Sequence, residues 1–142
     1  MATNEAEFKS EFKKDVESEY PGAHIWTSTD LLRSGLPDFY VLWGGLFVAV
    51  EAKFITKLPK KKSSLVLSHV VSPSQQSFLR DTQRNKQKGI VLIGSSHAAI
   101  VMEDIKENYT LEECLNAPRI RKENGVWQVK GLLNEWKQQV LL

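Results

Sequence analysis

Cysteine is almost absent from this sequence of 142 residues, with Cys114 as its single example. One cysteine cannot form an internal disulfide or a cysteine-rich zinc site. The three histidines, His24, His69 and His97, do not have the spacing of zinc ligands either. A chain without disulfides suits a reducing compartment, so we expect an intracellular, cytoplasmic protein.

Long hydrophobic runs are also missing. The longest apolar stretch, residues 36–50, contains Pro37, Asp38 and a glycine pair, whereas a membrane-spanning helix needs about 20 consecutive apolar residues. The N-terminal residues are polar and acidic, so we expect no secretory leader and no membrane partner. Hydrophobic residues make up 42% and charged residues 25% of the chain. These values predict one globular domain over residues 1–142.

Basic residues are concentrated in one part of the chain. The net charge is only +2, yet residues 52–90 contain nine basic residues and one acidic residue. Such a local excess predicts a surface that faces a polyanion. The expected DNA-binding residues are Lys57, Lys60, Lys61, Lys62, Arg80 and Arg84. The charge pattern alone is equally compatible with a solvated loop followed by a solvated helix face.

The order of elements predicts an α/β fold with a central mixed sheet flanked by helices. Phe8, Phe12 and Val16 recur every four residues and predict a helix over residues 4–19. Ser72 and Gln75 form a capping-box pattern that opens a helix expected over residues 72–88. Further strands are expected at 24–27, 37–43, 46–54, 90–93, 98–102, 119–122 and 126–130, and further helices at 110–115 and 132–140.

The Gly44-Gly45 pair predicts a tight hairpin. With a two-residue turn, Trp43 faces Leu46, and the same register brings Asp38 opposite Glu51. Because side chains alternate along a strand, Glu51 and Lys53 share one face. Both faces of these strands are rich in apolar residues, so we expect the sheet to be covered on both sides.

Two opposed carboxylates in a semi-buried place repel each other and lose hydration. A proton or a cation between them would relieve this cost. Oxygen ligands suit Mg²⁺, with Mn²⁺ as a substitute. A neighbouring lysine can orient a water or stabilise a phosphorane, as metal-assisted phosphodiester hydrolysis requires. The alternative is a pair of ordinary strand-end charges neutralised by Lys53.

The string Pro37-Asp38, twelve residues, then Glu51-Ala52-Lys53 resembles the signature of the PD-(D/E)XK nuclease superfamily. It is similar to the small phage-type VRR-NUC and Holliday-junction-resolvase-like endonucleases. Ser72-Pro73-Ser74-Gln75 followed by a glycine-initiated strand at 89–93 adds to this resemblance. The resemblance to these nucleases covers about residues 5–102. Residues 103–142 form an extension that could serve assembly or specificity.

The resemblance implies a restriction-endonuclease-like core and a role for each matching residue. Asp38 and Glu51 would bind the metal, helped by the main-chain carbonyl of Ala52, and Lys53 would position the attacking water. Gln75 would lie near the metal or the scissile phosphate, unless it is only a helix cap.

Such nucleases usually add a glutamate from the first helix. Glu5 lies on the apolar face of that helix, so we prefer it to Glu11. The alternative is that neither residue reaches the site.

The expected function is therefore that of a Mg²⁺-dependent endodeoxyribonuclease, selective for branched or junction DNA in phage-type recombination or replication. A homodimer is expected because duplex cleavage needs two cuts. One alternative is a site-specific duplex endonuclease of the homing or restriction type. The other is a non-catalytic DNA-binding module that has a nuclease fold.

Overall fold

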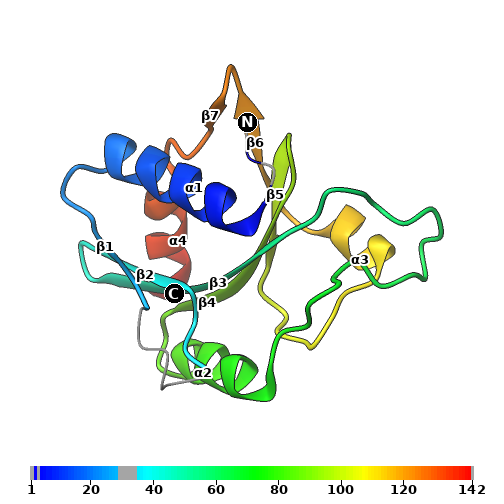
Figure 1. Cartoon of the computed structure of the whole chain (residues 1–142). Coiled ribbons are helices and arrows are strands. Elements are labelled where there is room, and N and C mark those ends of the chain that lie inside the picture. The colour runs from blue at the N-terminus through cyan, green and yellow to red at the C-terminus, as the bar shows by residue number, and fades with distance from the viewer. Residues whose placement is uncertain (1, 3, 29–34, 142) are drawn as a thin grey trace.

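The computed structural model describes residues 2, 4–28 and 35–141. It contains four helices and seven strands within these ranges (Figure 1). In chain order they are α1 (Glu5–Glu19), β1 (His24–Thr27), β2 (Phe39–Trp43), β3 (Leu46–Phe54), α2 (Pro73–Arg84), β4 (Lys88–Gly94), β5 (Ala98–Met102), α3 (Leu111–Asn116), β6 (Arg119–Glu123), β7 (Val126–Trp127) and α4 (Leu132–Leu141).

The strands form one mixed sheet in the order β1-β2-β3-β4-β5-β6-β7. Strands β3 and β4 are parallel, and all the other neighbouring pairs are antiparallel. A parallel pair requires a crossover connection, which here consists of the loop after β3 and helix α2. The prediction of an α/β fold with a central mixed sheet is confirmed.

Both faces of the sheet are covered by apolar layers, as predicted. Helices α1 and α4 pack on one face and α2 on the other (Figure 1), where α3 also contributes to the apolar layer. Strand alternation divides β3 between these layers, with Val48 and Val50 toward α1 and Ala49 toward α2. Glu51 and Lys53 follow Ala49 in steps of two, so they belong to the α2 face.

The predicted register of the β2–β3 hairpin is confirmed. Trp43 pairs with Leu46, and the ladder continues to Phe39 opposite Val50. Gly44 and Gly45 have φ values of 52° and 85°. Positive φ at both turn positions gives the type I′ geometry that matches strand twist, and glycine adopts it without strain. The next pair outward along this register is Asp38 and Glu51.

The prediction that α2 continues to Lys88 is wrong, because the helix ends at Arg84 and Lys88 begins β4. Lys88 is buried and pairs with Glu103, so it does not belong to an exposed basic face. Gly89 lies inside β4 rather than at a helix end. A Cβ there would lie 2.3 Å from the carbonyl oxygen of Leu79. Only glycine therefore permits the close packing of α2 on β4.

Residues 103–141 belong to the same fold as the residues before them. Trp127, Leu133 and Trp136 are buried in the layer that contains Phe8 and Phe12 of α1. Strand β7 is shorter than the predicted 126–130, and the β6–β7 hairpin turns at Asn124-Gly125, both with positive φ.

In the described part of the chain, none of the helices has the length and apolar character needed to cross a membrane.

Candidate metal centre and active site

The candidate site lies where β2 begins and β3 ends. Asp38 is anchored there, because its Oδ2 accepts a hydrogen bond of 2.8 Å from the backbone N–H of Ala52. Glu51 is only 3% exposed and Lys53 only 9%. The Lys53 ammonium lies 3.4 Å from Glu51 Oε2 and donates to the carbonyl oxygen of Val70 at 3.4 Å. The structure thus brings the three predicted residues together on one face of the hairpin.

Glu51 carries an unsatisfied polar atom. Its Oε1 is buried and has no hydrogen-bond partner in the structure. Burial first, and then the neighbouring Asp38 carboxylate, raise the pKa of Glu51 to about 8, against the opposing effect of Lys53. An ionised buried carboxylate without a full set of partners is costly. A cation between Glu51 and Asp38 would remove that cost.

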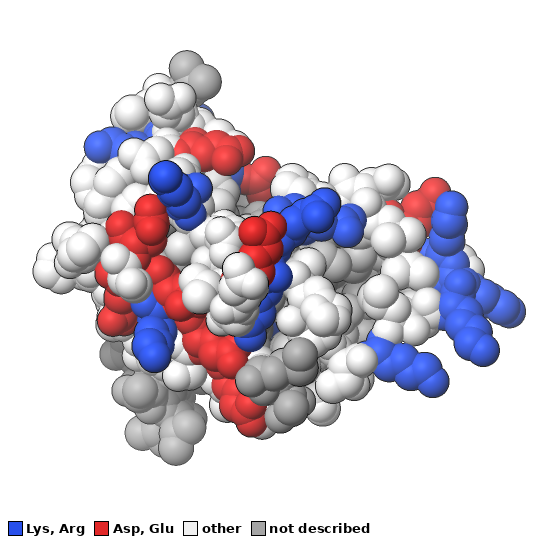
Figure 2. All heavy atoms as spheres, turned by 90° about the horizontal axis from the view of Figure 1, so that it is seen from above, with Lys and Arg blue, Asp and Glu red and all other residues white. Residues whose placement is uncertain are grey.

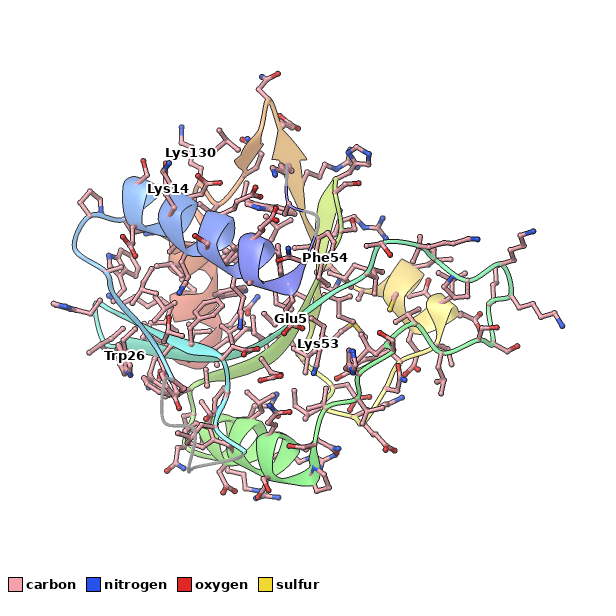
Figure 3. All side chains as sticks on the ribbon, viewed as in Figure 1. Glu5, Lys14, Trp26, Lys53, Phe54 and Lys130 are labelled. Carbon is pink, nitrogen blue, oxygen red and sulfur yellow. The ribbon has the colours of Figure 1, made fainter. Side chains whose placement is uncertain are left out.

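Glu5 lies beside this pair and Glu11 does not. Burial and the charge of Asp38 raise the pKa of Glu5, while Lys53 and Lys9 lower it. Figure 3 shows Glu5 and Lys53 close together in the region between α1 and α2. Glu11 instead forms an ion pair of 2.7 Å with Lys122. The preference for Glu5 over Glu11 thus agrees with the placement of these two side chains.

Gln75 forms the predicted capping box. The Gln75 side-chain Oε1 accepts a hydrogen bond from the backbone N–H of Ser72 at 3.0 Å, and the backbone N–H of Gln75 donates to Ser72 Oγ at 3.2 Å. This arrangement accounts for the glutamine as a helix cap. Helix α2 nevertheless begins three residues after Val70, whose carbonyl accepts a hydrogen bond from Lys53. A role of Gln75 toward a bound phosphate stays a prediction.

The predicted DNA-binding residues fall into two groups. Lys57, Lys60, Lys61 and Lys62 are exposed on the loop after β3, and Figure 2 shows basic side chains gathered on the lobe at its right. Arg80 donates to the carbonyl oxygen of Ile105 at 2.7 Å, and Arg84 pairs with Asp81 at 2.6 Å. The loop lysines are therefore more available to a polyanion than the two arginines, which already have partners.

The donor set fits a hard divalent cation. In residues 2, 4–28 and 35–141, no three histidine, cysteine, aspartate or glutamate side chains converge as a complete metal-binding group. Mg²⁺ does not need one, because it commonly takes one or two carboxylates and keeps several waters. Asp38 and Glu51 would hold it, with the carbonyl of Ala52 as a third oxygen. The unpartnered Glu51 Oε1 is the observation that supports this fit.

One charged residue of the site was not predicted. Lys9 extends from α1, and its ammonium lies 3.1 Å from Asp38 Oδ1. A usable signal was present in the sequence, because Lys9 follows Glu5 by four residues and residues at that spacing share a helix face. His69 also lies near Glu5 and lowers its pKa.

No protein-family model matches the chain, and a search of curated proteins gave no significant match.

Raising the pH toward 8 is expected to destabilise the metal-free protein. The folded-state pKa of Glu51 is about 8, above its ordinary value of 4.5. The folded protein therefore retains a proton that the unfolded chain releases, and the associated stability is lost as the pH rises through 8. Urea denaturation in EDTA between pH 4.5 and about 8 should show a decline in the free energy of unfolding of the wild type and a flatter pH profile for Glu51→Gln. Equal pH dependence in the two proteins would contradict the assignment to Glu51.

Proposed function

We propose that the protein is a Mg²⁺-dependent endodeoxyribonuclease of the PD-(D/E)XK type that acts on branched DNA. The observation that carries the proposal is the buried, unpartnered oxygen of Glu51 beside Asp38, with Lys53 on the same face. A cation between the two carboxylates would supply the partner that this buried oxygen lacks and would neutralise the second carboxylate beside it.

Each residue has a distinct part in the proposed hydrolysis. The metal, when bound, supplies charge neutralisation at the phosphate and a more acidic water. Asp38 is held in position by the N–H of Ala52, and Glu51 supplies an oxygen free to accept a new partner. The Lys53 ammonium is fixed by Glu51 and the Val70 carbonyl. From there it would orient the attacking water and stabilise negative charge that develops on the phosphate.

The charge distribution supports a nucleic acid as the substrate. The loop lysines 57 and 60–62 are exposed, and this loop directly continues β3, which carries Glu51 and Lys53. Phosphate contacts from such a loop supply affinity without sequence information. This suits an enzyme that selects a DNA structure rather than a sequence, and a homodimer would supply the two cuts that a junction requires.

The test is cleavage of a labelled four-way junction and a matching linear duplex. We expect cleavage in Mg²⁺ and none in EDTA, with the junction cut faster than the duplex. Cleavage of one duplex sequence only would replace the proposal with a site-specific endonuclease. Tight, salt-sensitive binding with no cleavage in Mg²⁺ or Mn²⁺ would replace it with a DNA-binding module.

A further inference from the structure

Lys9 binds the carboxylate that would receive the metal. Its ammonium lies 3.1 Å from Asp38 Oδ1, while Asp38 Oδ2 is held by the N–H of Ala52. Both oxygens of Asp38 therefore have a partner in the metal-free protein. The Ala52 contact is part of the backbone and stays in place, whereas the Lys9 contact depends on a flexible four-carbon side chain.

The two lysines of the site differ in how firmly they are held. Lys53 is 11% exposed in its side chain and contacts both Glu51 and Val70. The Lys9 side chain is 23% exposed and starts from α1, whose position is set by the buried Phe8 and Phe12. The backbone of Lys9 is thus fixed, while its ammonium can move within the reach of its side chain.

The charge balance indicates where that ammonium goes when a metal enters. Three carboxyl groups (Glu5, Asp38 and Glu51) face two ammonium groups (Lys9 and Lys53). With all five groups ionised, which is the state that binds a cation, their charges sum to one surplus negative charge. A divalent cation changes this to one surplus positive charge, which repels Lys9 and matches the single negative charge of a DNA phosphodiester.

We propose that Lys9 changes its partner when the metal binds, from the Asp38 carboxylate to a phosphate of the DNA. Its ammonium neutralises Asp38 while the metal is absent, and it is displaced to a nonbridging phosphate oxygen when metal and DNA are bound. The inference rests on the proposed nuclease function and adds to it a residue that couples metal binding to substrate binding.

Binding of Mn²⁺ to the DNA-free protein, measured by calorimetry, tests the first half. Lys9→Met keeps most of the apolar stem and removes the charge. We expect it to bind Mn²⁺ about three- to tenfold more tightly than wild type, because no ammonium has to be displaced. Lys13→Met is the matched control, since Lys13 lies one turn further along α1 and contacts Thr27 Oγ1 at 2.5 Å. It should leave the Mn²⁺ affinity unchanged.

Binding of the four-way junction in Ca²⁺, measured over a range of salt concentrations, tests the second half. Lys9→Met should weaken binding and reduce the slope of log K against log salt by about one, the value for one lost phosphate contact. Lys9→Arg should restore the slope.

Several outcomes would overturn the proposal, and they separate it from the proposed function. Unchanged or weaker Mn²⁺ binding in Lys9→Met would refute the displacement, and an unchanged salt slope would refute the transfer to phosphate. In either case metal-dependent cleavage by the wild type would leave the nuclease function intact. If neither wild type nor variant binds Mn²⁺, the metal centre is refuted and both proposals fail.

Discussion

Lys53→Ala is expected to abolish metal-dependent DNA cleavage. The ammonium of Lys53 is the buried cation of the site, held by Glu51 and the carbonyl of Val70. Loss of a preorganised group that orients water and stabilises developing charge costs about 10²- to 10⁴-fold in rate. Single-turnover cleavage of the junction at saturating protein measures this loss apart from binding.

The control for Lys53→Ala is Lys14→Ala. Lys14 is exposed on α1, and Figure 3 shows it well separated from Lys53. Both variants have lost one positive charge, so a general charge effect would lower both rates alike. Lys53→Met adds a check on packing, because it keeps the buried stem. Wild-type cleavage by a folded Lys53→Met would contradict the proposed role.

Trp127→Ala is expected to destabilise the protein by about 3–5 kcal/mol, the range for removal of a large aromatic side chain from a core. Trp127 is 1% exposed and packs edge-on against Phe8 at 5.4 Å and Phe12 at 6.1 Å between ring centroids. Its backbone N–H donates to Asp15 Oδ2 at 2.9 Å. The extension after residue 102 thus stabilises α1, the helix that carries Glu5 and Lys9.

Chemical denaturation of the metal-free protein measures this effect. The neighbouring Val126→Ala is the control, because Val126 is 47% exposed and surface substitutions usually change stability by less than about 0.5 kcal/mol. Equal, small losses in the two variants would show that the extension is separable from the core. They would leave assembly or specificity, as predicted from the sequence, as the role of the extension.

The hairpin and its charged residues could be predicted because their geometry is local. A two-residue glycine turn sets the register, and the period of two along a strand decides which side chains share a face. Asp38, Glu51 and Lys53 were therefore predicted together without knowledge of any other element. The same reasoning predicted α1, whose buried Phe8, Phe12 and Val16 follow the helical period.

The end of α2 could not be predicted in this way. A glycine after a helical pattern usually indicates a stop, yet Gly89 lies in β4, where its missing Cβ admits the backbone of Leu79. That contact joins two elements and leaves no periodic signal. The Lys88 side chain lies on the opposite face of the sheet, where it contacts Gln139 and Trp136 of α4, and its burial there keeps it out of any exposed basic face.

The sequence by itself determined the β2–β3 hairpin, the first helix and the placement of Asp38, Glu51 and Lys53 where β2 begins and β3 ends, because each depends on a local turn or a local period. The order of elements along the chain also indicated the mixed α/β character. Tertiary structure alone decided the rest. It paired Glu11 with Lys122 and Lys9 with Asp38 as ion pairs, and it buried Trp127 against α1. These contacts join segments far apart in the chain, and the packing of whole layers selects them rather than any local preference.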